Sequence, residues 1–122
     1  MDDLITWLRG LLDEDERVAR AAAECGSWRL EDEWAYGLGV GVARTTAPGF
    51  ILPEQWDHIR RHDPASVLAD ITAKRAILDE IVPALEGYEW DAVAERSTTE
   101  RLVRLLASAY ADRPGYQEAW RP

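Results

Sequence analysis

Two histidines stand four residues apart near the middle of the chain, at His58 and His62. On a helix this spacing brings both imidazoles to one face, as in helices that bind a metal ion. The intervening residues include Arg60 and Arg61 but no glutamate of the kind that zinc proteases use as a general base. Two guanidinium groups beside the pair would also repel a divalent cation. The pair is therefore a candidate metal site, and the competing interpretation is that both histidines are exposed and His62 stabilises a helix end.

Other residue types that support catalysis or phosphate binding lack the partners that such chemistry needs. Gly37, Gly39 and Gly41 alternate, but they lack the GxGxxG spacing of a dinucleotide loop and the lysine of a P-loop. The single cysteine, Cys25, stands near the expected end of a helix, where the negative end of the helix dipole opposes a thiolate. No catalytic triad can be assembled from the sequence. We therefore expect no catalytic residues and no cofactor.

The chain is strongly acidic, with 14 lysines and arginines against 23 aspartates and glutamates and a net charge of −9. This balance argues against binding to a phosphate backbone, so we expect no nucleic-acid partner. Six basic side chains could still gather into a patch for a phosphate or an acidic partner, although pairing with nearby carboxylates is the favoured interpretation. They are Arg60, Arg61, Lys74, Arg75, Arg101 and Arg104. The acidic run at residues 13–16 is interpreted as a solvated helix face.

The Asp63-Pro64 pair must position the histidines and arginines, because it predicts a corner between two helices. Proline has a helical φ, needs no amide partner in a first turn, and keeps the residue before it out of the α region. Asp63 can cap the second helix through a free amide in its first turn. We expect helices at residues 53–62 and 64–83, and Pro83 ends or kinks the second one. Its apolar stripe is Val67, Leu68, Ile71, Leu78, Ile81 and Val82.

Apolar residues at helical spacing also predict helices toward each end of the chain. The first spans residues 3–24, with an inner face of Leu4, Leu8, Leu11, Leu12, Val18 and Ala22. A short helix is expected at residues 88–95, and another begins at the capping box formed by residues 97–100 (Ser-Thr-Thr-Glu). The inner face of this last helix is expected at Leu102, Leu105, Leu106, Ala109 and Tyr110. Two aromatic residues within residues 116–122 indicate that the tail docks on the body.

Between Trp28 and Val42 the apolar period changes from 3.6 to 2, which is typical of strands with one buried face. The even positions hold Trp28, Leu30, Trp34, Tyr36, Leu38, Val40 and Val42. We expect one tryptophan-rich antiparallel hairpin near residues 27–46, with its turn near residues 31–33 or 37–39. Because an isolated hairpin is marginal in water, it must lie on the helices or pair with a second copy in a homodimer. The predicted fold class is α+β, mostly helical, with about four helices and this hairpin.

The length of 122 residues predicts a single domain, residues 1–122. Hydrophobic residues make up 47% and charged residues 30%, which is typical of a folded globular protein and not of a disordered chain. No apolar run approaches the ~20 residues of a membrane span, and the first residues lack the basic start of a signal peptide. We therefore expect a cytoplasmic protein with no membrane partner.

Six tryptophans are many for a chain of this length. Tryptophan serves cores and interfaces equally well, because its large apolar face carries one hydrogen-bond donor. We expect a protein partner, contacted by the aromatic residues that the core is least able to hide, Trp34 and Trp120. Arg60 and Arg61, beside the predicted helical corner, are the expected polar contacts.

Three stretches together resemble one known family: LITWLRGLLDEDERVARAA at residues 4–22, HIRRHDPASVLADITAKRAIL at residues 58–78 and LVRLLASAYADRPGYQEAWRP at residues 102–122. The combination of the HDP corner with the tail that ends in WRP is the specific part. The family consists of small uncharacterised actinobacterial and actinophage proteins, classified as a domain of unknown function. The resemblance implies a prokaryotic or phage cytosolic setting and brings no known activity. Residues 87–97 match no part of the family pattern.

These observations favour a non-catalytic protein-interaction, regulatory or accessory module of a bacterial or phage cytosol. One alternative is a metal-binding protein or metal-dependent enzyme that uses His58 and His62. The other alternative is an acidic decoy that mimics DNA, which requires carboxylates at phosphate-like spacing along one face. The arginines interspersed among the carboxylates argue against the decoy.

Overall fold

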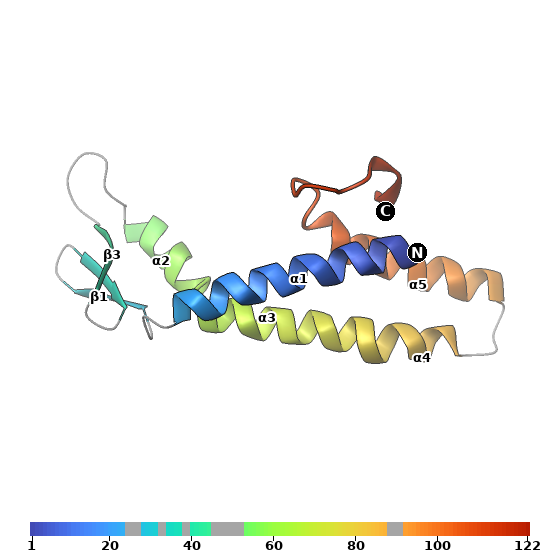
Figure 1. Ribbon diagram of the computed structural model, residues 1–122, viewed down its shortest axis with the longest axis horizontal. Helices are drawn as coiled ribbons and strands as arrows, with labels where there is room; N and C mark the ends of the chain where they lie inside the picture. Colours follow the sequence, from blue (N-terminus) through green and yellow to red (C-terminus); the bar gives the residue numbers. More distant parts are fainter. Residues whose placement is uncertain (24–27, 32–33, 38–39, 45–52, 88–91) are drawn as a thin grey trace. The chain divides into compact units, whose positions relative to one another are not determined.

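The computed structural model describes residues 1–23, 28–31, 34–37, 40–44, 53–87 and 92–122 (Figure 1). Their contacts divide the chain into two compact units. The terminal unit comprises Met1–Glu14 and Ile71–Pro122, and the central unit comprises Asp15–Asp70. Two helices, α1 (Asp2–Ala23) and α3 (Pro64–Ala76), contribute residues to both units. That residues 1–122 form a single domain stays a prediction.

Buried leucines at every fourth position of α1 form part of the core of the terminal unit. Leu4, Leu8 and Leu12 are all buried, as the expected inner face requires. The other buried side chains of this unit come from a long helix, formed by α3, π-helix η1 (Ile77–Ile81) and α4 (Val82–Glu86), and from α5 (Ala92–Ser108). They are Ile71, Leu78, Val82, Thr99, Val103 and Ala107. Burying a leucine stabilises a fold by about 1.5–3 kcal/mol, so apolar packing holds these helices together.

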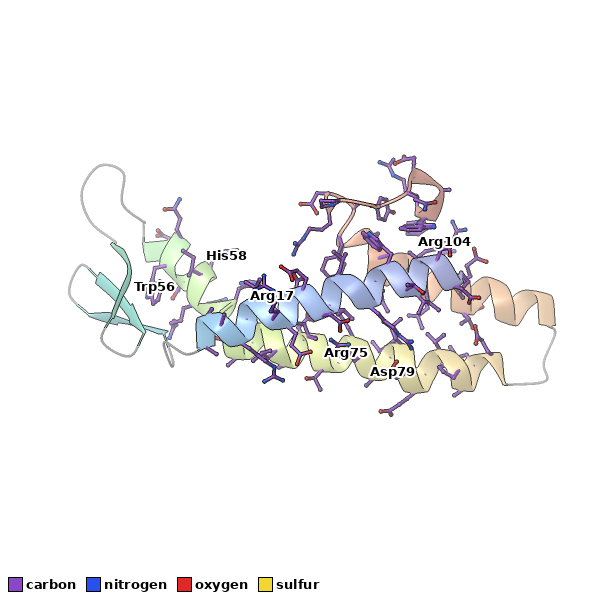
Figure 2. The ribbon with its side chains drawn as sticks, in the orientation of Figure 1. Arg17, Trp56, His58, Arg75, Asp79 and Arg104 are labelled. Atoms are coloured by element: carbon purple, nitrogen blue, oxygen red, sulfur yellow. The ribbon has the colours of Figure 1, made fainter. Side chains whose placement is uncertain are left out.

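Two ion pairs fix the direction of α1 against the long helix in the terminal unit. Arg9 Nη2 lies 2.6 Å from Asp79 Oδ1, and Arg75 Nη2 lies 2.6 Å from Asp13 Oδ1. Arg75 and Asp79 are one turn apart on the long helix (Figure 2), and Arg9 and Asp13 are one turn apart on α1. The lower number on one helix pairs with the higher number on the other, so the helices are antiparallel. Each pair is partly exposed and contributes only about 0.2–1 kcal/mol, but together they disfavour a slip by one turn.

A π-turn interrupts the long helix just before Pro83. The amide of Val82 donates to the carbonyl of Ile77, five residues earlier. Proline cannot donate, and its ring crowds the carbonyl four residues before it, so the wider turn relieves the conflict and the helix continues through α4. The turn also rotates Ile81 off the face that holds Leu78. Ile81 is therefore 48% exposed, although the apolar spacing predicted that it would be buried.

α5 is one continuous helix, and the expected start of a helix at residue 97 is wrong. The residues of the predicted capping box lie inside α5, because Thr99 is only 1% exposed and belongs to the core. From residue 98 onward, where the side chains of α5 are described, its buried residues are Thr99, Val103 and Ala107, at intervals of four. Leu105, which was expected on the inner face, is 50% exposed. Of the short helix expected at residues 88–95, the part from Ala92 belongs to α5 and the rest lies outside the described residues.

The C-terminal residues 114–122 dock on α1, as their aromatic content predicted. Trp7 Nε1 donates a hydrogen bond of 3.1 Å to the carbonyl of Pro114. The Trp7 ring centre lies 5.6 Å from that of Tyr116 and 5.2 Å from that of Trp120. Gly115 has φ +85°, and a Cβ at this position would lie 2.9 Å from Trp7 Nε1. The close approach of the tail to Trp7 therefore depends on glycine at this position.

Arg104 attaches the same tail to α5. Its Nη1 donates to the carbonyls of Ala119 at 2.7 Å and Arg121 at 3.1 Å. Its Nε and Nη2 donate to Glu100 Oε1 at 3.0 and 2.6 Å. Arg104 therefore lies between α5 and the tail with all three of its nitrogens engaged (Figure 2).

The strand region overturns the predicted α+β fold with one hairpin. Three short strands, β1 (Trp28–Glu31), β2 (Trp34–Gly37) and β3 (Val40–Arg44), form one antiparallel sheet in the order β1-β2-β3. The two turn positions considered for a single hairpin both separate strands, so the alternating run is divided into three segments. The chain as a whole is mostly helical, and every buried apolar side chain among those described lies on a helix.

The two ladders of this sheet differ in regularity. β1 pairs with β2 from Trp28 opposite Gly37 to Glu31 opposite Trp34. β2 pairs with β3, with Trp34 opposite Arg44, and the register shifts by one residue between Ala35 and Tyr36. Such a shift is a β-bulge, which strict alternation in the sequence does not predict.

Candidate functional site

The corner between α2 (Pro53–Arg61) and α3 brings the predicted histidines and arginines together in the central unit. Asp63 Oδ1 accepts a hydrogen bond of 2.9 Å from the amide of Ser66, and α3 begins at Pro64. Asp63 is therefore the cap that the sequence predicted, a contact that stabilises a helix by about 0.5–2 kcal/mol. The proline and the cap together fix where one helix ends and the next begins.

Cationic side chains extend into solvent at the end of α2. Arg60 and Arg61 are both exposed. Arg60 Nη2 lies 3.3 Å from Asp57 Oδ1, and each of these side chains is 54% exposed, so solvent screens the pair and its contribution is small. Arg61 forms no ion pair or hydrogen bond within the described residues. An exposed guanidinium of this kind can bind an external anion, such as a carboxylate, through charge-assisted hydrogen bonds.

The two histidines contact each other at the surface of the corner, with His58 on the last turn of α2 (Figure 2). Both are exposed, and their ring centres lie 4.4 Å apart with the planes inclined by 36°. His62 Nδ1 lies 2.8 Å from the backbone carbonyl oxygen of His58. A carbonyl can only accept, so Nδ1 of His62 carries the proton in this contact. The predicted helical spacing is thus confirmed as a physical contact between the imidazoles.

A half-open cavity of about 350 Å³ lies beside this corner. Among the described residues, those that line it are Arg61, His62, Ser66, Val67 and Asp70. His62, Ser66 and Asp70 recur every four residues, which places them along one face where the chain turns into α3. Its volume is near the lower limit of roughly 300–1,000 Å³ for small-ligand sites, so the cavity can hold one side chain of a partner or a small ligand.

Ser66, Val67 and Asp70 were not predicted as site residues. Their only sequence pattern is the interval of four that begins at His62, and an interval of four also describes any helix face. Asp70 already has a partner within the structure. Arg61 is the charged group of the cavity with no described partner.

Two features are absent from the part of the chain that the structure describes. No three or more histidine, cysteine, aspartate and glutamate side chains converge as a metal site. No helix there has both the length and the apolar character that a membrane span needs. Cys25 lies outside the described residues.

The two tryptophans predicted as partner contacts lie in different units and differ in what is known of their side chains. Trp34 begins β2, opposite Glu31 and Arg44, and its side chain is not described. Trp120 is partly buried and packs against Trp7 in the terminal unit. Part of the Trp120 surface is therefore used to hold the tail in place.

Most of the basic residues considered for a patch in the terminal unit have partners within that unit. Lys74 Nζ donates to the hydroxyl of Tyr110 at 2.7 Å and lies 4.9 Å from the centre of its ring. Arg75 pairs with Asp13, and Arg104 pairs with Glu100. For Arg75 and Arg104 the favoured interpretation, pairing with a carboxylate, is confirmed, whereas Lys74 donates to a tyrosine hydroxyl.

The acidic run at residues 13–16 is also engaged with arginines. Asp13 pairs with Arg75, and Glu16 Oε1 accepts from Arg20 Nη2 at 2.7 Å. Glu14 and Asp15 each have a polar interaction as well. The run therefore differs from the bare row of carboxylates that would imitate a phosphate backbone.

Comparison with known proteins gives a family but no characterised relative. A family model, described as a family of unknown function (DUF6221), matches residues 1–122. No curated protein and no solved structure gave a significant match. The match includes all three stretches on which the resemblance rested, and also residues 87–97, which had seemed unlike the family.

Proposed function

Since the chain belongs to the DUF6221 family, we propose that this family member is a non-catalytic binding module. Its α2–α3 corner binds a short acidic segment of a protein partner. The exposed guanidinium of Arg61 carries the proposal, because it forms no described ion pair and lines a cavity in a chain of net charge −9. Arg60 supports it from the neighbouring position.

The chemistry of the cavity supports a carboxylate as the recognised group. A guanidinium presents two parallel donors that match the two oxygens of an aspartate or glutamate side chain. The Ser66 hydroxyl can add a further donor, and Val67 offers an apolar contact for the methylenes of a glutamate. The segment must be short, because the net charge of −9 repels a long acidic stretch from the rest of the surface.

The two tryptophans belong to the proposal as aromatic contacts, but their tests differ. Trp34 lies on β2 and outside the α2–α3 corner in sequence, so replacing it with alanine tests the strand region separately from the arginines. Replacing Trp120 also removes the ring contact with Trp7, so its effect on binding must be compared with its effect on the docking of the tail.

We place this module in the cytoplasm of an actinobacterium or of a phage-infected cell. The support is the resemblance carried by the HDP corner and the WRP tail, together with the family match over the whole chain. The proposed role is regulatory or accessory, which fits a module that acts by binding.

A labelled peptide tests the proposal without a known partner. The probe is a short blocked peptide with two adjacent glutamates, and its matched control has two glutamines. Fluorescence anisotropy compares the full chain with the Arg60→Ala/Arg61→Ala double variant. A second double variant, Arg20→Ala/Arg121→Ala, removes the same charge from exposed arginines that pair locally with Glu16 and Glu118.

Loss of the two corner arginines should weaken peptide binding by roughly 2- to 30-fold, since each exposed arginine–carboxylate contact contributes about 0.2–1 kcal/mol. The Arg20/Arg121 variant should bind like the wild type apart from a small uniform effect of net charge. Added salt should weaken binding to the wild type. Equal affinities of the two double variants, or equal binding of the glutamine peptide, would contradict the proposal.

A further inference from the structure

We propose that His58 and His62 form a two-imidazole chelate for a late divalent transition metal, with Cu²⁺ preferred over Zn²⁺. This inference goes beyond the proposed function, because it requires neither Arg61 nor an acidic partner. It rests on the contact between the rings, the orientation of His62 and the exposure of both side chains.

The ring centres lie close enough for one nitrogen of each imidazole to bind the same ion. With a metal–nitrogen bond of about 2.0–2.1 Å and a nitrogen about 1.1 Å from the ring centre, each ring centre lies about 3.2 Å from the metal. Two such rings have centres about 4.5 Å apart at 90° and about 5.2 Å apart at the tetrahedral angle. The observed separation is 4.4 Å. Cu²⁺ is preferred because the Irving–Williams order places Cu²⁺ above Zn²⁺ for nitrogen ligands, and because Cu²⁺ accepts two imidazoles in an otherwise water-ligated tetragonal site.

The hydrogen bond from His62 Nδ1 leaves Nε2 of the same ring as the nitrogen that can bind a metal ion. Because Nδ1 donates to the carbonyl of His58 at 2.8 Å, the neutral ring has its lone pair on Nε2. Histidines that bind metals commonly donate their other ring nitrogen to a carbonyl or carboxylate, which fixes the tautomer and the ring orientation. The His58 ring has no hydrogen bond within the described residues, so it can turn a nitrogen toward the same ion.

The charged residues around the histidines lower the affinity for a metal ion but do not prevent binding. Arg60 and Arg61 are the nearest cations in sequence and oppose a dication, although exposed charges are screened by salt. Asp57 lies 3.3 Å from Arg60, and Asp63 caps α3, so each of these carboxylates already has a partner within the chain. The remaining coordination positions are left to water. The site is therefore an open chelate and not a closed structural metal centre.

The direct test is a metal titration of the full chain after treatment with a chelator, in a non-coordinating buffer. Isothermal titration calorimetry with Cu²⁺ and with Zn²⁺ gives stoichiometry and affinity. Electron paramagnetic resonance at less than one Cu²⁺ per chain reports whether nitrogen ligands are present. The variants are His58→Gln, His62→Gln and the double replacement, and the matched control is Glu54→Gln, a change of an exposed residue on the same helix.

We expect one Cu²⁺ per chain, with nitrogen coupling in the spectrum and weaker binding of Zn²⁺. Each single histidine variant should lose about tenfold or more in Cu²⁺ affinity, because the second imidazole acts at a high effective concentration once the first is bound. The double variant should lose the nitrogen signal, and Glu54→Gln should match the wild type. Single variants with wild-type affinity, an oxygen-only spectrum, or Zn²⁺ bound as tightly as Cu²⁺ would overturn the inference. Because the peptide test uses metal-free protein and different variants, failure of one proposal is distinguishable from failure of the other.

Discussion

Replacing Gly115 with alanine is the sharpest perturbation that the structure offers for the terminal unit. Gly115 has φ +85°, a conformation that costs an L-residue roughly 1–2 kcal/mol. The added Cβ would lie 2.9 Å from Nε1 and 3.2 Å from Cδ1 of Trp7, so the indole must move. That movement breaks the hydrogen bond to Pro114, with a net value of about 0.5–1.5 kcal/mol. It also weakens the ring contacts with Tyr116 and Trp120, at about 0.5–1.5 kcal/mol for each pair.

Summed in full, these terms predict that Gly115→Ala lowers the free energy of unfolding by about 2.5–6.5 kcal/mol. The loss cannot exceed the free energy with which the tail docks, because a detached tail relieves both the strain and the clash. Urea denaturation followed by far-ultraviolet circular dichroism measures the change in stability. The near-ultraviolet spectrum, which depends on packed tryptophans, reports the detachment itself.

Gly10→Ala is the matched control, because it makes the same chemical change inside α1 with nothing within 4 Å of the new Cβ. Glycine in a helix interior costs about 0.5–1 kcal/mol relative to alanine, so this variant should be more stable than the wild type. Opposite signs at the two glycines are the expected result. The reasoning would be refuted if Gly115→Ala kept wild-type stability and an unchanged near-ultraviolet spectrum.

Three further changes test other contacts by urea denaturation. Thr99→Val should stabilise the chain by about 1 kcal/mol, because the buried Thr99 hydroxyl has no hydrogen-bond partner. A loss of stability in this variant would show that the hydroxyl is hydrogen-bonded. Asp63→Ala should cost about 0.5–2 kcal/mol through loss of the cap, whereas Ser66→Ala, which keeps the donating amide, should cost much less. Arg9→Asp and Asp79→Arg should each destabilise the chain, and the double variant that exchanges the two residues should recover most of the lost stability. This coupling would be missing if α1 and η1 were not adjacent.

The parts of the fold that follow local rules could be predicted from the sequence. Asp63 and Pro64 determine a corner within a few residues of chain, and the structure has both the cap and the helix start. The leucines of α1 repeat every four residues, and Leu4, Leu8 and Leu12 are buried. Val18, placed on the same face, is 51% exposed, because Ala19 continues the stripe and is buried.

The errors arose where contacts between distant residues override a local pattern. The capping box of residues 97–100 is a valid helix start in isolation, but packing of Thr99 in the core makes it part of a longer helix. The π-turn before Pro83 changes which residues share a face, so Ile81 is exposed. One alternating run gave no means of choosing between two turns, and both positions separate strands.

The candidate site was predictable only in its residue types. The spacing of His58 and His62 predicts a shared face, which their ring contact confirms. The cavity beside them also depends on Ser66 and Asp70, whose interval of four has no chemical signature. No pattern in the sequence indicates that Arg61 lacks a described partner whereas Arg75 reaches Asp13, because ion pairs between helices depend on the fold.

The central claim is that an acidic segment binds at the α2–α3 corner, and an amide shift titration tests it most directly. Two-dimensional ¹H–¹⁵N spectra of the metal-free chain are recorded as the diglutamate peptide is added. We predict saturable shifts that cluster in residues 58–70 and disappear in the Arg60→Ala/Arg61→Ala variant. Shifts confined to other residues, or shifts at the corner that persist without these arginines, would contradict the claim.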